Sequence, residues 1–183
     1  MWRRADAAQP WYRCHASSKS PLHFGRRRFH RWDDPDGEYG VLYLAEDPYG
    51  AFLESIGRAF LRTRFVPRTV LESTALAEIR FQGGLKLVDL AASAGLTRLG
   101  AEGSIAAGTD YQVSQAWSRA IHVHRTGPDG LYYPSRFDPA RRSCAVFDRR
   151  AADAKVIRRL GSWSRQTQLL GQVLDHYGFG TDM

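Results

Sequence analysis

Short apolar segments of strand character, separated by single helical or turn-rich stretches, constrain the fold of this chain most strongly. Such segments predict strands at residues 11–15, 41–44, 74–81, 85–89, 130–134 and 143–147. Gly83 and Gly84 predict a tight hairpin turn between the third and fourth of them. Strands scattered among isolated helices favour an α+β domain over a doubly wound sheet. Because 183 residues is about the length of one domain, we expect residues 1–183 to form a single domain.

Local signals also place the helices. Asp47 followed by Pro48 predicts a helix start, with the aspartate as N-cap and the proline at the first helical position. The apolar spacing that follows extends this helix to about Phe60. A second helix is expected over 110–122, capped by its first residue, an aspartate, and a C-terminal helix is expected over about 164–177.

The charge of the chain points to an anionic partner. It carries 26 Lys and Arg against 19 Asp and Glu, and only three of the 26 are lysine. Arginine suits bidentate contacts to phosphate, so a nucleic acid or a phosphate-bearing ligand fits this charge, and a solvated surface rich in arginine fits it equally. The N-terminal residues do not resemble a signal peptide, and no apolar run reaches the roughly 20 residues that span a bilayer. We therefore expect a cytoplasmic protein without a membrane partner.

A basic and aromatic cluster follows the first predicted strand. Residues 26–32 contain four arginines interleaved with Phe29, His30 and Trp32. This composition fits a nucleic-acid-binding loop, a dinucleotide pocket or a solvated basic loop. The sequence has no Walker A, GxGxxG, HExxH or GxSxG motif, and no helix-turn-helix, RNP-like or zinc-finger pattern. A metal site is not expected, because Cys14 and Cys144 form no CxxC pair, and His122 and His124 lack a third ligand nearby.

Four segments in a particular order carry the functional interpretation. They are Trp-Tyr-Arg at 11–13, an Arg-Trp-Asp turn and a Leu-Tyr-x-Ala strand within 30–45, a helix bearing glutamate at 51–54, and Asp-Gly-Leu-Tyr-Tyr-Pro-Ser-Arg at 129–136. Their order and contexts resemble the RES domain family, named for its Arg, Glu and Ser residues. The resemblance covers about residues 11–150. It implies an α+β fold similar to the ADP-ribosyltransferases, with a split β-sheet core and flanking helices.

The resemblance also implies an activity and partners. Many RES proteins are toxins that cleave the nicotinamide–ribose bond of NAD by hydrolysis or phosphorolysis, so NAD is a substrate here and no cofactor is expected. Others are described as transferring ADP-ribose to proteins, which is the alternative activity. The implied partner is an Xre-type helix-turn-helix antitoxin, with homo-oligomers within that complex. A basic nucleic-acid-binding module is the interpretation from a different class.

The resemblance assigns residues as well. Arg31, Glu54 and Ser135 take the positions of the family Arg, Glu and Ser as catalytic residues, and Arg13 and Tyr43 match two further pocket positions that would bind NAD with Arg31. Arg28 also precedes an aromatic residue and stays open as the family arginine. Taken singly, the glutamate fits a solvated helix face, the tyrosine a core position and the serine a turn. Tyr111 and Gln115 also resemble a recurrent family segment and receive no role beyond a place in the pocket lining, and residues 61–110 receive no role.

These residue types suit the chemistry. Cleavage of an N-glycosidic bond passes through an oxocarbenium-like ribosyl cation, which the Glu54 carboxylate would stabilise. Arg13 and Arg31 would bind the pyrophosphate, and Tyr43 would offer an aromatic face to nicotinamide. Ser135 would donate either to the ligand or to Glu54. Nicotinamide leaves as a neutral molecule, so a single carboxylate is sufficient, and we expect these side chains to line one cleft.

Overall fold

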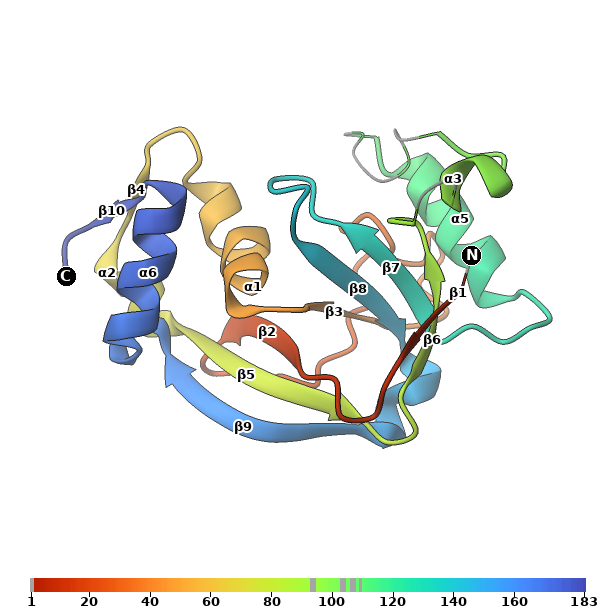
Figure 1. The fold of residues 1–183 in the computed structure, drawn as a ribbon, viewed down its shortest axis with the longest axis horizontal. Coiled ribbons are helices and arrows are strands. Elements are labelled where there is room, and N and C mark those ends of the chain that lie inside the picture. Colours follow the sequence, from red (N-terminus) through yellow and green to blue (C-terminus); the bar gives the residue numbers. More distant parts are fainter. Residues whose placement is uncertain (1, 93–94, 103–104, 106–107, 109) are drawn as a thin grey trace.

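The computed structural model describes residues 2–92, 95–102, 105, 108 and 110–183. One mixed sheet runs through this part of the chain (Figure 1). Its strands, in spatial order, are β1 (Trp2–Ala5), β6 (Leu85–Asp89), β7 (Gly130–Pro134), β8 (Arg142–Phe147), β3 (Val41–Ala45), β2 (Trp11–Ala16), β5 (Thr74–Phe81) and β9 (Ala154–Ser162). Neighbouring strands are antiparallel except for β6 and β7. The predicted α+β fold is therefore confirmed.

The sheet nearly divides between β2 and β3. These two strands share one register pair, Tyr12 with Ala45, whereas β2 pairs with β5 over six residues and β3 pairs with β8 over five. At the other end of β3, Val41 exchanges two backbone hydrogen bonds of 2.9 and 3.0 Å with Gly25, in the segment that leads from β2 to β3. Because that segment takes the place of β2 beside β3, the two halves of the sheet separate and leave space between them.

Helix α1 (Pro48–Ser55) begins where the sequence predicts and ends earlier. The Asp47 carboxylate accepts the Gly50 N–H at 2.8 Å, and Pro48 occupies the first turn. The expected extension to Phe60 is wrong, because the chain changes to a short 3₁₀ turn, η1 (Gly57–Ala59). Glycine costs about 1 kcal/mol relative to alanine inside a helix. A Cβ at Gly57 would also lie 3.0 Å from the Leu53 side chain, so the glycine allows close packing at this turn.

Two further helices agree with the sequence apart from their first residues. Helix α5 (Gln112–His122) has Tyr111 at its N-cap, and the Asp110 carboxylate, expected to be the cap, accepts the Gln112 N–H at 2.9 Å. Helix α6 (Thr167–Tyr177) follows the 3₁₀ turn η3 (Trp163–Arg165) and ends at Gly178, whose φ of 67° is the left-handed C-cap conformation that favours glycine. The remaining described elements are η2 (Asp148–Asp153), α2 (Arg68–Ser73), α3 (Gly95–Arg98), and the paired strands β4 (Phe65–Val66) and β10 (Gly180–Thr181).

The predicted hairpin at Gly83 and Gly84 is wrong. Both glycines have positive φ, but β5 pairs with β2 and β9, while β6 pairs with β1 and β7. The turn therefore carries the chain from one half of the sheet to the other. A Cβ at Gly84 would lie 2.2 Å from the Ala5 carbonyl oxygen, so the glycine is needed for close backbone approach at the end of β1.

Separate apolar clusters fix the helices against the two ends of the sheet. One cluster contains Phe52 of α1, Trp163 of η3 and Val173 of α6. In another, Trp32 and Phe147 pack with Ile121 of α5. Figure 1 accordingly shows α1, α2 and α6 at one end of the molecule and α3 and α5 at the other. Part of the segment 61–110, for which we predict no role, lies outside the described residues. Within the described part, no helix has the length and apolar character needed to cross a bilayer.

Candidate active site

A cleft of about 330 Å³ lies where the sheet divides. Tyr12 and Ala45, the pair that joins the two halves, both line it, and so do side chains from α1 and from the loop between β7 and β8. This volume is at the lower end of the range of about 300–1,000 Å³ for small-molecule sites. The lining includes Arg13, Arg31, Tyr43 and Glu54 among the residues that the sequence predicts.

Glu54 and Ser135 meet at one wall of the cleft. The Ser135 hydroxyl donates to Glu54 Oε1 at 2.5 Å, the short distance of a hydrogen bond to a charged acceptor. Its oxygen in turn accepts the N–H groups of Phe137 and Asp138 at 3.2 and 3.3 Å. Ser135 is 2% exposed and is not part of the cleft lining, contrary to our expectation. It lies behind Glu54, so of the two roles left open for this serine, the contact with Glu54 is the one seen.

Arg31 enters the cleft and Arg28 does not. The Arg31 side chain is buried, donates to the Ile105 carbonyl oxygen at 3.2 Å and lies 4.9 Å from the centroid of the Tyr111 ring. Burial lowers the pKa of its guanidinium below the ordinary value for arginine. Arg28 is exposed, has a φ of 63° and does not contribute to the lining. Of the two candidates for the family arginine, the cleft lining thus contains Arg31 and not Arg28.

The turn that carries Arg31 is held by a hydrogen-bond network beneath it. The Tyr43 hydroxyl donates to Asp33 at 2.9 Å and accepts the Trp32 N–H at 3.0 Å. Asp33 also accepts the His30 N–H at 3.0 Å. Burial, reinforced by Asp33, raises the pKa of Tyr43 well above 10, so its hydroxyl keeps its proton in this network. The ring of Tyr43 therefore remains as the part that can face a ligand, with His30 edge-on at 5.3 Å between ring centroids.

Gln115 contributes to the same turn from α5. Its amide donates to the carbonyl oxygens of Arg28 and His30, both at 3.0 Å, and it is not among the lining residues. Of the two residues that the sequence suggested as pocket lining, Tyr111 lines the cleft and Gln115 anchors the turn beside it.

Arg13 reaches the cleft from β2, in the other half of the sheet. Its guanidinium donates to the carbonyl oxygens of Pro21 and His23 at 3.0 and 2.9 Å. Burial lowers the pKa of Arg13 to about 10, which leaves it charged at neutral pH. The two described hydrogen bonds of this guanidinium go to uncharged carbonyl oxygens, so its charge is not neutralised by them. An anion bound beside it would compensate for the lost solvation.

Three basic lining residues were missed by the sequence interpretation. Arg58 lies in η1, Arg136 follows Ser135, and His30 precedes Arg31. Arg58 had a usable signal, since it is four residues after Glu54, a spacing that places side chains on one helical face. Among the described lining residues, four arginines thus accompany one carboxylate, Glu54, an excess of positive charge that fits a doubly anionic ligand.

Partial desolvation together with nearby cations lowers the pKa of the His30 imidazole, although part of this side chain is exposed. Burial is the largest cause of its lowered pKa, and Arg58, Arg13 and Arg27 act in the same direction, against the carboxylate of Asp33. Because a neutral imidazole both donates and accepts, His30 can hydrogen-bond a ligand without adding a further cation.

The basic cluster at 26–32 divides between different environments. Arg26 forms an ion pair of 2.7 Å with Asp148, Arg31 is in the cleft, and Phe29 is 72% exposed.

His122 stacks on Tyr39 with ring centroids 3.8 Å apart. Within the residues that the structure describes, no group of three or more His, Cys, Asp or Glu side chains is placed to hold a metal ion.

With this geometry in place, comparison with known proteins decides the family. The profile of the RES domain matches residues 10–168, which include every site residue described above. The chain belongs to the RES domain family. Over 79 residues it is 32% identical to "Probable toxin y4kH" of Sinorhizobium fredii (strain NBRC 101917 / NGR234), a match that spans 43% of this chain and 61% of that protein.

A solved structure shares the fold of this RES domain. It is a chain of the M. tuberculosis MbcT–MbcA toxin–antitoxin complex, which superposes with a TM-score of 0.71 over 91% of each chain. The two sequences are 21% identical, so the likeness concerns the fold. The overall fold is therefore one already seen in an experimental structure.

Proposed function

We propose that this RES domain cleaves the nicotinamide–ribose bond of NAD. The observation that carries the proposal is the Glu54 carboxylate, oriented by Ser135 at 2.5 Å, in a cleft whose lining also contains four arginines. The pyrophosphate of NAD brings two negative charges, which suit Arg13 of β2 and Arg31 of the turn between β2 and β3. The ring of Tyr43 is the aromatic surface for nicotinamide.

The reaction needs little acid–base chemistry from the protein. The bond between ribose C1′ and the pyridinium nitrogen breaks, and its electron pair leaves with neutral nicotinamide. The positive charge that develops on the ribose lies beside Glu54, whose fixed carboxylate stabilises it. An acceptor oxygen then forms the new bond at C1′. Water loses a proton to solvent in this step, whereas an anionic oxygen of inorganic phosphate has none to lose. A protein side chain as acceptor would give ADP-ribosyl transfer by the same first step.

We further propose that the domain acts as a toxin neutralised by an antitoxin. Two similarities support this role: the relative named as a toxin and the shared fold with a chain of a toxin–antitoxin complex. The resemblance of the sequence to RES proteins favours an Xre-type helix-turn-helix partner, in a complex that contains more than one copy of the toxin.

The direct experiment follows nicotinamide release by the purified protein. NAD would be supplied with and without inorganic phosphate, and with labelled adenylate to detect a modified protein band. Release in buffer alone indicates hydrolysis, release that requires phosphate indicates phosphorolysis, and a labelled band indicates protein transfer. No release under any of these conditions contradicts the proposal.

The His30 environment predicts tighter binding of the pyrophosphate at lower pH. A bound diphosphate favours the imidazolium, so its binding raises the lowered pKa of His30 and takes up a proton. We expect the affinity for ADP-ribose to increase about three- to tenfold from pH 8 to pH 6. Calorimetric titration measures it, and His30→Asn should remove the dependence while His124→Asn, after α5, should retain it. An equal dependence in both variants would show that another group takes up the proton.

A further inference from the structure

Arg141 joins three parts of the structure, namely the loop between β7 and β8, the start of α1 and the end of α6. It lies at the end of the loop between β7 and β8, and its guanidinium Nη1 donates to Asp47 Oδ2 at 3.0 Å. The same guanidinium lies 3.5 Å from Asp138 Oδ2 and 4.7 Å from the centroid of the Tyr49 ring. Asp47 is the N-cap of α1, so this ion pair attaches the loop to the helix that carries Glu54.

The backbone of Arg141 also closes the loop that carries Ser135. Its carbonyl oxygen accepts the Ser135 N–H at 2.9 Å, and its own N–H donates to the Asp138 carbonyl oxygen at 2.9 Å. The Asp138 N–H in turn donates to the Ser135 hydroxyl oxygen. A continuous circuit of contacts thus runs from Asp47 through Arg141 to Ser135, and returns through Glu54 and α1.

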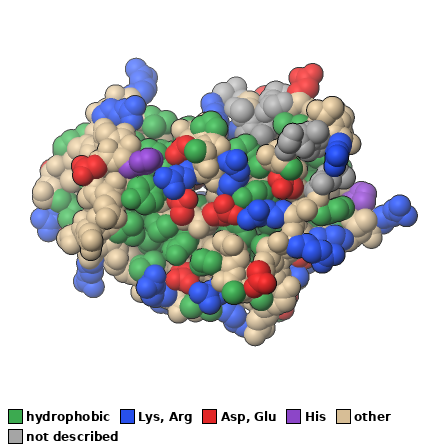
Figure 2. Space-filling model, viewed as in Figure 1, with side chains coloured by type: hydrophobic (Ala, Val, Ile, Leu, Met, Phe, Trp, Pro, Cys, Tyr) green, Lys and Arg blue, Asp and Glu red, His purple; other side chains and the backbone are tan. Residues whose placement is uncertain are grey.

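The C-terminal helix completes this arrangement. The Tyr177 hydroxyl at the end of α6 donates to Asp138 Oδ2 at 3.1 Å, on the carboxylate that also faces Arg141. The ring of His176 packs edge-on against Tyr49 at 5.3 Å between centroids. Both α6 residues lie beyond position 168, where the match to the RES domain ends. In Figure 2, acidic and basic side chains gather at the centre of the face on which α1 and β8 lie.

We infer that Arg141 is a positioning residue for the Glu54–Ser135 pair, with Asp47 and Asp138 as its partners and with Tyr177 bound to Asp138. The expected effect on catalysis rests on the proposed NAD cleavage. The expected effect on the position of the loop rests on the contacts alone. Arg141 is not among the cleft-lining residues, so it acts by fixing the loop relative to α1. A displacement of about 1 Å in a catalytic group can cost a factor of 10² in rate. The short bond between Ser135 and Glu54 leaves little room for such a shift.

The kinetic test is a double-mutant cycle. Arg141→Met keeps an apolar stem over Tyr49 and removes the charge, while Asp47→Asn keeps an N-cap oxygen and removes the ion-pair partner. We expect each variant to lower kcat for nicotinamide release about tenfold or more, with KM within about threefold of wild type. The double variant should lose little more than either single variant, because all three break the same attachment.

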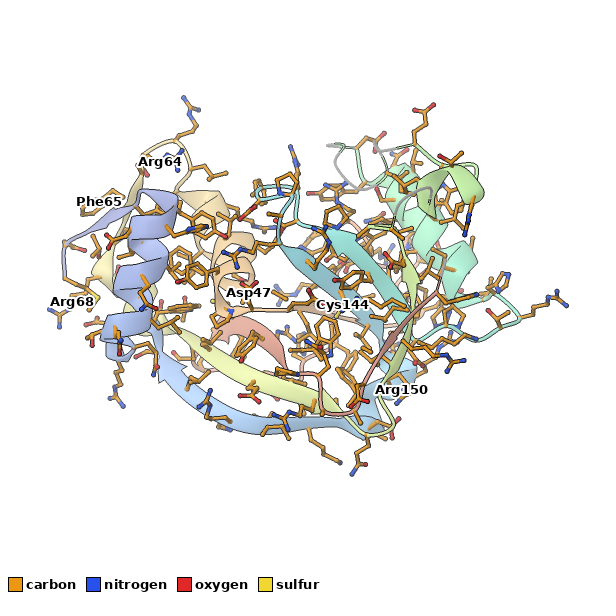
Figure 3. The ribbon with its side chains drawn as sticks, in the orientation of Figure 1. Asp47, Arg64, Phe65, Arg68, Cys144 and Arg150 are labelled. Atoms are coloured by element: carbon orange, nitrogen blue, oxygen red, sulfur yellow. The ribbon has the colours of Figure 1, made fainter. Side chains whose placement is uncertain are left out.

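Arg150→Met is the matched control. Arg150 is similarly buried, with 20% of its side chain exposed against 26% for Arg141, and it too contacts two carboxylates, Asp129 and Asp153. In Figure 3, Arg150 lies well away from Asp47, the N-cap residue of α1. A comparable loss of thermal stability with an unchanged kcat is expected for this variant. An equal fall in kcat in both arginine variants would assign Arg141 a merely structural role and overturn the inference.

Hydrogen exchange gives a readout that does not depend on activity. In Arg141→Met the amides of Ser135, Phe137 and Asp138 should exchange at least about tenfold faster, while those of β7 keep their wild-type rates. Tyr177→Phe, which removes only one hydroxyl, should accelerate the same amides by a smaller factor. Unchanged exchange in this loop overturns the inference even if NAD cleavage is confirmed. If the wild-type protein releases no nicotinamide, the proposed function and the catalytic part of the inference both fail, and the exchange result still decides whether Arg141 holds the loop.

Discussion

Glu54→Gln should reduce nicotinamide release by a factor on the order of 10²–10³, with little change in KM for NAD. The substitution keeps the size of the side chain and an oxygen that can accept the Ser135 hydroxyl. It removes the negative charge that faces the developing ribosyl cation, an interaction that is strongest in the transition state. Steady-state kinetics of nicotinamide release measure both parameters, and expression in cells would show whether growth arrest is lost in parallel.

Glu72→Gln provides the control for this experiment. Glu72 is an exposed residue of α2 that pairs with Arg68 at 2.7 Å, away from the cleft lining. We expect this variant to retain wild-type kinetics. A Glu54→Gln protein that is folded and still cleaves NAD at the wild-type rate would remove the carboxylate from the mechanism and with it the main support for the proposed reaction.

Arg31→Met should weaken binding of ADP-ribose on the order of 10²-fold. Hydrogen bonds to charged groups contribute about 1.5–3 kcal/mol each, and the substitution removes the contacts that the buried Arg31 guanidinium would make to a pyrophosphate. Methionine fits beside the Tyr111 ring, so the loss should concern binding more than folding. Isothermal calorimetry with ADP-ribose measures the effect directly.

The same measurement on Arg28→Met separates the two arginines that the sequence left open. Arg28 is exposed and outside the cleft lining, so its loss should change the dissociation constant by less than about threefold at moderate salt. A larger effect at Arg28 than at Arg31 would mean that the ligand lies across the rim of the cleft, and would reverse the assignment.

Local chemistry made much of the fold predictable from sequence. Asp47 and Pro48 start α1 because each satisfies a requirement of the first helical turn that depends on nothing distant in the chain. The strands that contribute to the cleft were likewise visible as short apolar runs. The Arg31 turn and Glu54 came from their motif contexts, and the structure brings both to the cleft.

Features that depend on distant contacts were not predictable in the same way. Gly83 and Gly84 looked like a hairpin turn, but their positive φ angles serve a crossing past Ala5, about 80 residues earlier in the chain. Ser135 lies behind Glu54 because of the loop that Arg141 closes, and no local pattern encodes that loop. Which residues pair across the divided sheet is a question of packing, and sequence periodicity carries no information about it.

The position of Tyr177 has a consequence for when the proposed activity can first appear during synthesis of the chain. A ribosome synthesises Glu54, Ser135 and Arg141 before it reaches α6, whose last residue contacts Asp138. If α6 is needed to hold the Ser135 loop, a nascent chain that already contains all the cleft residues remains a poor enzyme until that helix leaves the ribosome. The interval would give a cell time to bring an antitoxin to a toxin that is still being made.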